Sequence, residues 1–232
     1  MKLFAGEKIL KIVKYFQLIL FLLCFQPAVA ESLDQQKTAE RFIENIKGIK
    51  SYQADFEQKV HNEMGAEVDY SSGKFYIQNT NHFRWEVEEV FPQLIIGNGK
   101  YIYTYDPELE QVTIQNQGQT LEDSPLLLLT STAEKLLASY HVTILIDQKK
   151  KGQLLFELKP KAEGSVFESV HVLFSKGKIS ELLMKDSMGQ QTTVTFQKVK
   201  MNESLNSRLF IFTPPEGVDI IDSRERLLEE SP

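Results

Sequence analysis

The sequence predicts a mainly β protein with some α-helix, organised as an antiparallel sandwich or barrel. From residue 51 onward, apolar and polar residues alternate with a period of two, which is typical of strands with one buried face. Asn98-Gly99 lies between two apolar runs and predicts a tight hairpin. An amphipathic helix precedes these strands and a helical stretch interrupts them, so the protein is not purely β.

The composition excludes several classes of protein. Of the 232 residues, 42% are hydrophobic and 25% are charged, which is close to the globular average and excludes bulk disorder, collagen and coiled coils. The formal net charge of −6 gives no basic footprint for nucleic acid. The single cysteine, Cys24, cannot close an intrachain disulfide.

Residues 1–30 predict a cleaved secretory signal peptide. Four lysines precede the apolar run 16–25, and Ala28-Val29-Ala30 forms an A-x-A cleavage site. The alternative is a transmembrane anchor, but the run is only about half as long as the ~20 apolar residues that a bilayer needs. Leu23 precedes Cys24 where a lipoprotein would need a small residue. We therefore expect an exported, soluble chain without a lipid anchor, with a single domain at 31–222 and a charged tail at 223–232.

The first element of the mature chain is predicted to be one amphipathic helix. Ser32 and Gln35 have the spacing of a capping box, and Gly48 is a plausible stop. Between them, apolar residues recur with helical period at Ala39, Phe42, Ile43 and Ile46.

Short strands follow the helix. Tyr52, Ala54 and Phe56 alternate with polar residues, and the same pattern recurs around 75–77 and 83–87. The Asn98-Gly99 hairpin joins 94–96 to 101–103. Alternation is imperfect at 94–96 and 182–184, which suits either a core or an apolar cavity. Further strands are predicted at 112–114, 142–146, 154–158, 170–174, 179–185 and 192–199.

Residues 123–140 interrupt the strands and predict two short helices, at 125–129 and 132–139. Ser124 is a natural N-cap, with Pro125 at the first helical position. Four successive leucines, Leu126, Leu127, Leu128 and Leu129, cannot all face one core from a short helix. The segment is therefore either a plug that closes a barrel end or a lid over a cavity.

The sequence contains no recognisable catalytic or metal-binding motif. His61, His82, His141 and His171 are scattered singly, without the spacing of metal ligands. There is no nucleophile elbow, phosphate-binding loop or dinucleotide fingerprint. We predict no catalytic residue, no metal and no cofactor.

An ordered set of motifs resembles the outer-membrane lipoprotein carrier protein family, the LolA family. The motifs run through essentially the whole mature chain. They are Phe56-Glu57-Gln58, Gly73-Lys74-Phe75, Phe83-Arg84-Trp85-Glu86, PQLIIGNGK at 92–100, YDPELEQV at 105–112, Ser124-Pro125-Leu126, DSMGQ at 186–190 and FTPPEGV at 212–218.

The resemblance implies a fold and a function. The fold would be an incomplete antiparallel β-barrel, closed by short helices around a hydrophobic cavity. The function would be carriage of lipoproteins through the periplasm of a Gram-negative bacterium, by a monomer that encloses their acyl chains. An inner-membrane lipoprotein-releasing ABC transporter would supply the cargo, and an outer-membrane lipoprotein acceptor would receive it.

The resemblance also assigns candidate residues. Phe83 and Trp85 occupy the F-x-W strand of the family, where the phenylalanine lies at the cavity mouth; ordinary core packing is the alternative. Ile95 and the four leucines at 126–129 are candidates for the cavity and its lid. The family usually has arginine and proline where this sequence has Asn79 and Thr80. Arg84 is the candidate substitute for that arginine as lid latch, although alternation points it away from Trp85.

Two other functions compete with the carrier. The first is a periplasmic scaffold that senses lipid or lipoprotein with a similar open barrel, but such sensors usually carry a second domain. The second is an envelope hydrolase, which would need a nucleophile beside a base in the pocket.

Overall fold

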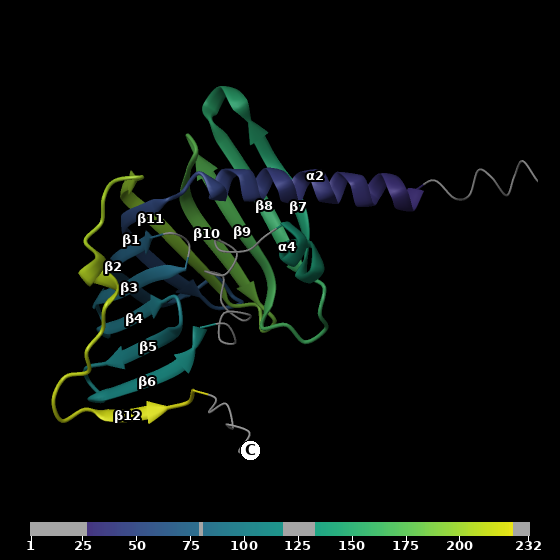
Figure 1. The fold of residues 1–232 in the computed structure, drawn as a ribbon. Helices are drawn as coiled ribbons and strands as arrows, with labels where there is room; N and C mark the ends of the chain where they lie inside the picture. Colours follow the sequence, from purple (N-terminus) through teal and green to yellow (C-terminus); the bar gives the residue numbers. More distant parts are fainter. Residues whose placement is uncertain (1–26, 79–80, 118–132, 225–232) are drawn as a thin grey trace, which may run out of the picture.

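A strongly curved, open β-sheet forms most of the protein in the computed structural model, which describes residues 27–78, 81–117 and 133–224 (Figure 1). Within these ranges, twelve strands lie in the order β12-β6-β5-β4-β3-β2-β1-β11-β10-β9-β8-β7, so the described sheet has two edges and does not close. All neighbours pair antiparallel except β12 and β6. The predicted incomplete antiparallel barrel is confirmed.

The described elements follow one another along the chain as a helix, a first group of strands, a short helix and a second group of strands. Their bounds are α2 (Pro27–Lys47), β1 (Ser51–His61), β2 (Glu67–Gln78), β3 (His82–Glu89), β4 (Gln93–Asn98), β5 (Tyr101–Asp106), β6 (Gln111–Asn116), α4 (Ala133–Ser139), β7 (Tyr140–Gln148), η3 (Lys149–Lys151), β8 (Gln153–Pro160), β9 (Phe167–Ser175), β10 (Lys178–Asp186), β11 (Gln191–Met201), η4 (Ser207–Phe210) and β12 (Asp219–Asp222).

Helix α2 begins earlier than the sequence pattern predicts. It begins at Pro27, so Ser32 lies inside the helix and not at its N-cap. A proline in the first turn costs no hydrogen bond, because the first N–H groups of a helix have no intrahelical partner. Gln35 does not close the predicted capping box: its Oε1 accepts a hydrogen bond of 2.9 Å from the backbone N of Val142 in β7. The helix end at Lys47, before Gly48, agrees with the prediction.

Short polar side chains fix the hairpin turns. Gly99 has φ +88° at the first of the two loop residues between β4 and β5, a conformation that favours glycine. Asn98 Oδ1 accepts hydrogen bonds from the backbone N of Lys100 and Tyr101. Asp186 caps the turn between β10 and β11 in the same way, through Met188 and Gln190. The predicted hairpin at Asn98-Gly99 is confirmed.

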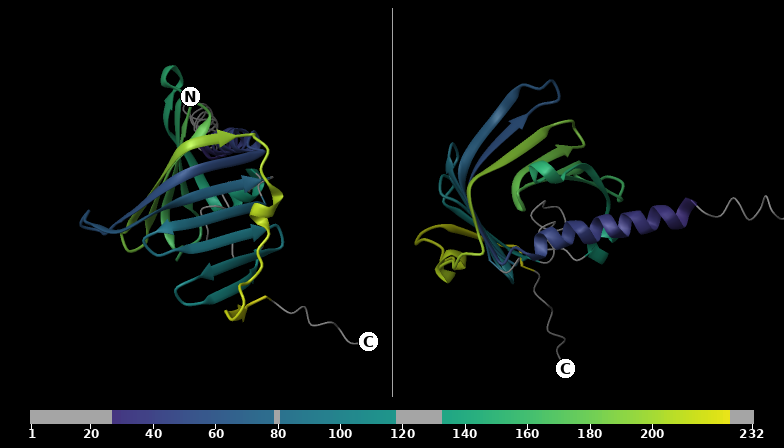
Figure 2. Two further views of the ribbon diagram at one scale, coloured as in Figure 1. Left: turned by 90° about the vertical axis from the view of Figure 1, so that its left-hand side faces the viewer. Right: turned by 90° about the horizontal axis from the view of Figure 1, so that it is seen from above.

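The main core lies on the concave face of the sheet, under α2. Phe42 of α2 packs edge-on against Phe156 of β8 and Phe174 of β9, with ring centroids 5.0 and 6.2 Å apart. Ala39, Ile43 and Ile46, which share the helical period of Phe42, are buried as well. The helix therefore covers the β7–β9 half of the concave face with the apolar stripe that its sequence predicts (Figures 1 and 2).

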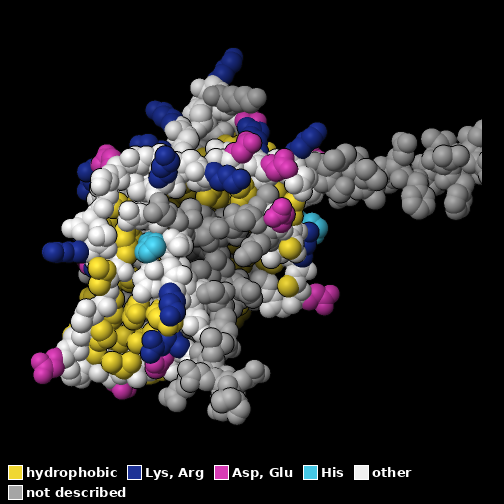
Figure 3. Space-filling view, viewed as in Figure 1, with side chains coloured by type: hydrophobic (Ala, Val, Ile, Leu, Met, Phe, Trp, Pro, Cys, Tyr) yellow, Lys and Arg dark blue, Asp and Glu magenta, His cyan; other side chains and the backbone are white. Residues whose placement is uncertain are grey.

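A second, smaller core lies on the convex face of β3–β6. Residues 202–218, which we call the C-terminal strap, run from the end of β11 across this face to β12 (Figure 2). Under the strap, Ile96, Val112 and Ile114 are buried, and the ring of Phe212 packs against Tyr103 and Tyr105. This cover explains why 94–96 breaks the alternation: the sheet is apolar on both faces here. Hydrophobic side chains also gather at the surface of this region, at the lower left of Figure 3.

The helical interruption is described in part. The helix predicted at 132–139 is observed as α4 and packs against α2, whereas the predicted helix 125–129 lies outside the described residues. Across the described ranges, no helix combines the length and apolar character that crossing a bilayer requires.

We expect Phe210 to be a major contributor to stability, because it anchors the strap in the convex core. Its side chain is 3% exposed and its ring lies 5.9 Å from that of His82. Phe210→Ala should lower the free energy of unfolding by ~3–5 kcal/mol in a urea titration. Phe91, which is 68% exposed, provides the matched control, and Phe91→Ala should change that free energy by less than ~0.5 kcal/mol. Equal effects of the two substitutions would contradict the packed strap.

Candidate functional site

An aromatic row forms the floor of the concave face. The ring of Trp85 stacks on Phe56 with centroids 3.9 Å apart and an interplanar angle of 26°. Phe75 lies 5.2 Å from Trp85 and 5.7 Å from Phe196, and Tyr52 lies 5.7 Å from Phe196. Because β3, β2, β1 and β11 are neighbours, residues at alternate positions of four strands meet side by side. The result is a broad apolar surface in the middle of the sheet.

Phe83, Trp85 and Ile95 all face this concave surface. Trp85 of β3 pairs directly with Phe75 of β2 and with Ile95 of β4, and directly paired residues share one face. Phe83 lies two residues before Trp85 and therefore on the same face. Phe83 is buried, whereas Trp85 and Ile95 are partly buried and pack against the core. The structure thus brings these three candidates together.

A glycine in the neighbouring strand makes room for the ring of Phe83. Phe83 pairs with Gly97 of β4, and a Cβ at Gly97 would lie 2.2 Å from Cε1 of Phe83. No side chain can occupy that position while the ring stays where it is. The phenyl ring therefore lies over the backbone of β4, at the end of the aromatic surface.

A buried tyrosine hydroxyl ties the aromatic row to β10. Tyr52 donates a hydrogen bond of 2.8 Å to the carbonyl oxygen of Ile179, and its side chain is fully buried. Burial raises the pKa of the Tyr52 phenol above its ordinary value, because the charged form would lose its hydration. The hydroxyl therefore stays protonated and satisfied, and it adds no reactive group to the apolar surface.

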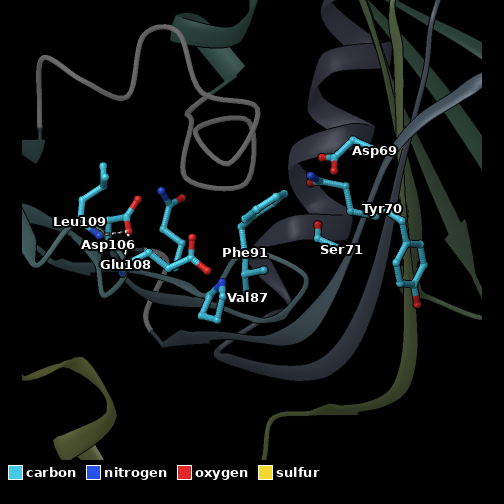
Figure 4. A pocket seen from close by; sticks show the side chains of 11 residues that line it. Asp69, Tyr70, Ser71, Val87, Phe91, Asp106, Glu108 and Leu109 are labelled. Carbon is cyan, nitrogen blue, oxygen red and sulfur yellow. Dashed lines mark hydrogen bonds between the residues drawn. The ribbon is translucent and has the colours of Figure 1, made fainter.

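A partly polar hollow of about 350 Å³ lies at one end of the concave face (Figure 4). In this view Phe91 lies between Asp69 and Ser71 on one side and Asp106 and Leu109 on the other. These residues come from β2, from the β3–β4 loop and from the end of β5 and the turn after it. The concave surface is therefore aromatic in its middle and bordered by carboxylates and a hydroxyl at this rim.

The titratable groups of the described residues are dispersed. Nowhere in the described ranges do three His, Cys, Asp or Glu side chains lie close enough to hold a metal ion. His171 approaches Glu157 at 3.2 Å, and His61 approaches Glu67 at 4.0 Å. Each of these glutamates also pairs with a lysine, Glu157 with Lys159 and Glu67 with Lys59. The described part of the chain thus gathers apolar side chains on the concave face, whereas its ionisable side chains form no metal-binding cluster.

The family model of the outer membrane lipoprotein carrier protein LolA matches residues 47–213 of this chain. This stretch contains the whole aromatic row and most of the strap. The chain belongs to the LolA family. The resemblance that the motifs predicted is thereby confirmed.

Members of the LolA family from several bacteria match most of the chain. An outer-membrane lipoprotein carrier protein of Pseudomonas paraeruginosa is 34% identical over 189 residues, which cover 81% of this chain and 89% of that protein. A protein of the same name from Azotobacter vinelandii is 32% identical over 206 residues, which cover 87% and 98%.

The fold is also similar to that of a solved structure. An uncharacterised conserved protein of Thermus thermophilus superposes with a TM-score of 0.51 at 11% identity, covering 79% of this chain and 98% of that one. At this identity, the likeness concerns the fold alone.

The predicted lid and its latch are only partly within the structure. Asn79, which replaces the usual LolA-family arginine, lies outside the described residues, as do Leu126, Leu127, Leu128 and Leu129. Arg84 is described and points to the convex face. Its Nε bonds Glu86 at 3.0 Å and its Nη1 reaches the carbonyl oxygen of Leu209 at 3.5 Å. Arg84 therefore contacts the C-terminal strap, on the opposite side of the sheet from α2.

Sequence reasoning did not single out Phe56 and Phe75 as partners of Trp85, or Phe196 as a partner of Phe75. Each stands at an apolar position of a predicted strand, so the period-two pattern placed them on a buried face. Their convergence depends on the register of β1 with β2 and of β1 with β11. The register of β1 with β11 cannot be read from the sequence, because these two strands are far apart along the chain.

We expect Gly97→Ala to disturb the concave surface by displacing the Phe83 ring. The free energy of unfolding should fall by ~1–3 kcal/mol, because a methyl group is forced into a packed site. Gly48→Ala is the matched control: a methyl group there would meet no non-neighbouring residue within 4 Å, so the change should stay below ~0.5 kcal/mol. In a Phe83→Ala background, the cost of Gly97→Ala should shrink, as a double-mutant cycle would measure. An unchanged cost would contradict the proposed contact.

Proposed function

We propose that this protein is a periplasmic carrier that binds the acyl chains of lipoproteins against the concave face of its sheet. The observation that carries the proposal is the aromatic row around Trp85, in a chain that belongs to the LolA family. Its relatives are named as lipoprotein carriers and not as enzymes, and they do not favour the sensing scaffold. In this proposal Phe83, Trp85 and Ile95 contact the acyl chains.

The route of the cargo is part of the same proposal. Residues 1–30 would direct export and be removed, and the mature chain would act as a monomer of one domain, 31–222. Helix α2 would remain from Glu31 on, with its core-facing residues intact. An inner-membrane ABC transporter would load the carrier and an outer-membrane acceptor would unload it. The carrier itself would need no cofactor.

A carrier that buries acyl chains needs an unfavourable contribution to the binding free energy, so that the cargo can be released. Each buried methylene stabilises a complex by ~0.8 kcal/mol, so one enclosed sixteen-carbon chain contributes roughly 12 kcal/mol, which corresponds to nanomolar affinity. Several chains held this tightly would not be released on a useful timescale. We propose that Leu126, Leu127, Leu128 and Leu129 cover the apolar concave face in the empty protein, so that opening this lid offsets part of the binding energy. Asn79, at the position of the family arginine, is a candidate for the latch of that lid.

The single tryptophan allows acyl-chain binding to be located directly. A fatty acid with a nitroxide on its chain should quench the fluorescence of Trp85, because the ring lies on the concave floor. Ile95→Asp should weaken binding by about tenfold or more, since it places a charge where the chain would lie. Met188→Asp, on a turn where the native side chain is 79% exposed, should leave the affinity unchanged. Binding without quenching would place the ligand elsewhere and contradict the proposal.

A release assay tests the carrier function itself. Protein added to spheroplasts that make a tagged lipoprotein should bring the tag into the soluble fraction as a one-to-one complex. Leu128→Asp should change the amount of lipoprotein released, because a charged carboxylate cannot pack against the apolar concave face. Absence of release, with another LolA-family carrier active in parallel, would favour the sensing scaffold. Unchanged release by Leu128→Asp would refute the lid assignment alone.

A further inference from the structure

Exposed lysines gather at one end of the sheet. Strand pairing places the turns after β2, β4, β7 and β9 and the end of β11 at the same end of the strands, because Gln78 pairs with His82, His82 with Asn98, and Tyr52 with Met201. We call this the basic end. Its exposed lysines include Lys47, Lys50, Lys100, Lys150, Lys151, Lys176 and Lys200.

The lysines of the basic end differ from those elsewhere in their partners. Within the described ranges, none of them forms an ion pair, whereas lysines on other parts of the sheet do. Of the carboxylates near the basic end, Asp147 pairs with Arg41 and Asp222 with Arg224, and Glu44 and Glu203 are exposed. The positive charge at this end is therefore largely uncompensated. The lysines outside the basic end that form ion pairs are Lys59, Lys74, Lys159, Lys185 and Lys198.

A second group of aromatic rings, on the convex face, adjoins the basic end. The rings of Tyr101 and Tyr103 lie 6.5 Å apart, and Phe212 of the strap lies 5.5 Å from Tyr103. Lys100 and Arg224 each lie 4.9 Å from the ring centroid of Tyr101. Figure 3 shows hydrophobic side chains gathered at the lower left of the molecule, with Lys and Arg side chains beside them.

We propose that the basic end, together with the adjoining rings of Tyr101, Tyr103 and Phe212, binds the surface of a membrane that contains anionic phospholipids. The lysines are distributed over several turns and do not converge on one pocket, which suits a diffuse layer of phosphate groups. Tyrosine side chains suit the boundary between headgroups and acyl chains, because the ring is apolar and its hydroxyl is hydrated, and Phe212 adds a further apolar ring. This inference goes beyond the proposed carrier function and does not depend on it.

The mature chain 31–232 has 22 Lys and Arg against 31 Asp and Glu, and its net charge of −9 does not prevent this binding. Charges separated by more than the Debye length, about 8 Å at physiological ionic strength, are largely screened. The local charge of the basic end therefore decides the interaction, and distant carboxylates contribute little. Many of those carboxylates lie at the opposite end of the strands, where Glu63, Glu67, Asp69, Glu108 and Glu110 are exposed. This separation of charge would orient the protein with its basic end toward the lipid.

Vesicle flotation with protein purified from the periplasm tests the proposal. The protein should float with phosphatidylcholine vesicles that contain about one third phosphatidylglycerol, but not with pure phosphatidylcholine, and high salt should abolish the binding. The triple variant Lys100→Gln, Lys150→Gln, Lys176→Gln should partition to the anionic vesicles at least about tenfold more weakly. Ile211→Ser, in the strap where the native side chain is 65% exposed, should weaken binding further.

A matched variant separates local from overall charge. Lys59→Gln, Lys159→Gln, Lys185→Gln removes the same charge from paired lysines elsewhere and should bind like the unmodified protein. Circular dichroism should show both triple variants folded, because every substituted side chain is exposed or part of a surface pair. Equal losses in the two triple variants, or no preference for anionic vesicles, would overturn the proposal. Lysine-dependent binding to poly-glutamate without binding to vesicles would overturn it in favour of an acidic protein partner.

Discussion

The structure depends on one constraint: an open sheet that is apolar on its concave face cannot cover that face with its own strands. A closed barrel fills its interior from all sides, but here β7 and β12 remain edges. Other elements must therefore provide the cover. Helix α2 does so over β7–β9, where Phe42 packs among Phe156 and Phe174. The aromatic row around Trp85 lies beyond these contacts, toward the other half of the sheet.

In the proposed carrier, this division of the concave face joins stability to function. One half is covered by α2, and the other half holds Phe83, Trp85 and Ile95, of which Phe83 belongs to the hydrophobic core and the other two pack against it. Aromatic side chains suit such a floor, because they bury large areas while losing few rotamers. A surface that must accept and release an apolar chain benefits from rigidity, since less freedom is lost on binding. The convex core supports this floor from behind, through the strap and Ile96.

The two faces and the two ends of the sheet therefore carry different properties. The concave face is apolar, the convex face of β3–β6 is covered by the strap, and charge separates along the strand direction. In an antiparallel sheet, successive turns lie at opposite ends of the strands. Residues in every second turn along the chain therefore lie at the same end of the sheet. Lys100 and Lys176 come to lie at the same end of the strands in this way, although β3, β2, β1 and β11 lie between their turns. A composition that is only mildly acidic thus contains a strongly basic end.

Much of the secondary structure and the family could be predicted from the sequence alone. The period-two alternation, the Asn98-Gly99 hairpin and the stripe of Ala39, Phe42, Ile43 and Ile46 depend on interactions between near neighbours, and the structure has them as predicted. Phe83 and Trp85 could be identified as candidates because their motif is local. The Pro27 start of α2 was missed, because the capping-box pattern at Ser32 gave a plausible later start and the residue that engages Gln35 lies in β7.

Which faces of the sheet are covered, and which distant residues are in contact, became clear only from the fold. Strand β12 pairs in parallel with β6 after the long strap, and a four-residue edge strand carries too little pattern to predict that partner. The same holds for the contact of Arg84 with Leu209 and for the aromatic row, in which Phe56 and Phe75 contact Trp85 and Phe196 contacts Phe75. These features depend on how segments that are far apart along the chain meet, and the place of Phe196 depends on the register of β1 with β11. Register is fixed by the burial of whole faces at once, which is a property of the folded sheet and not of any segment.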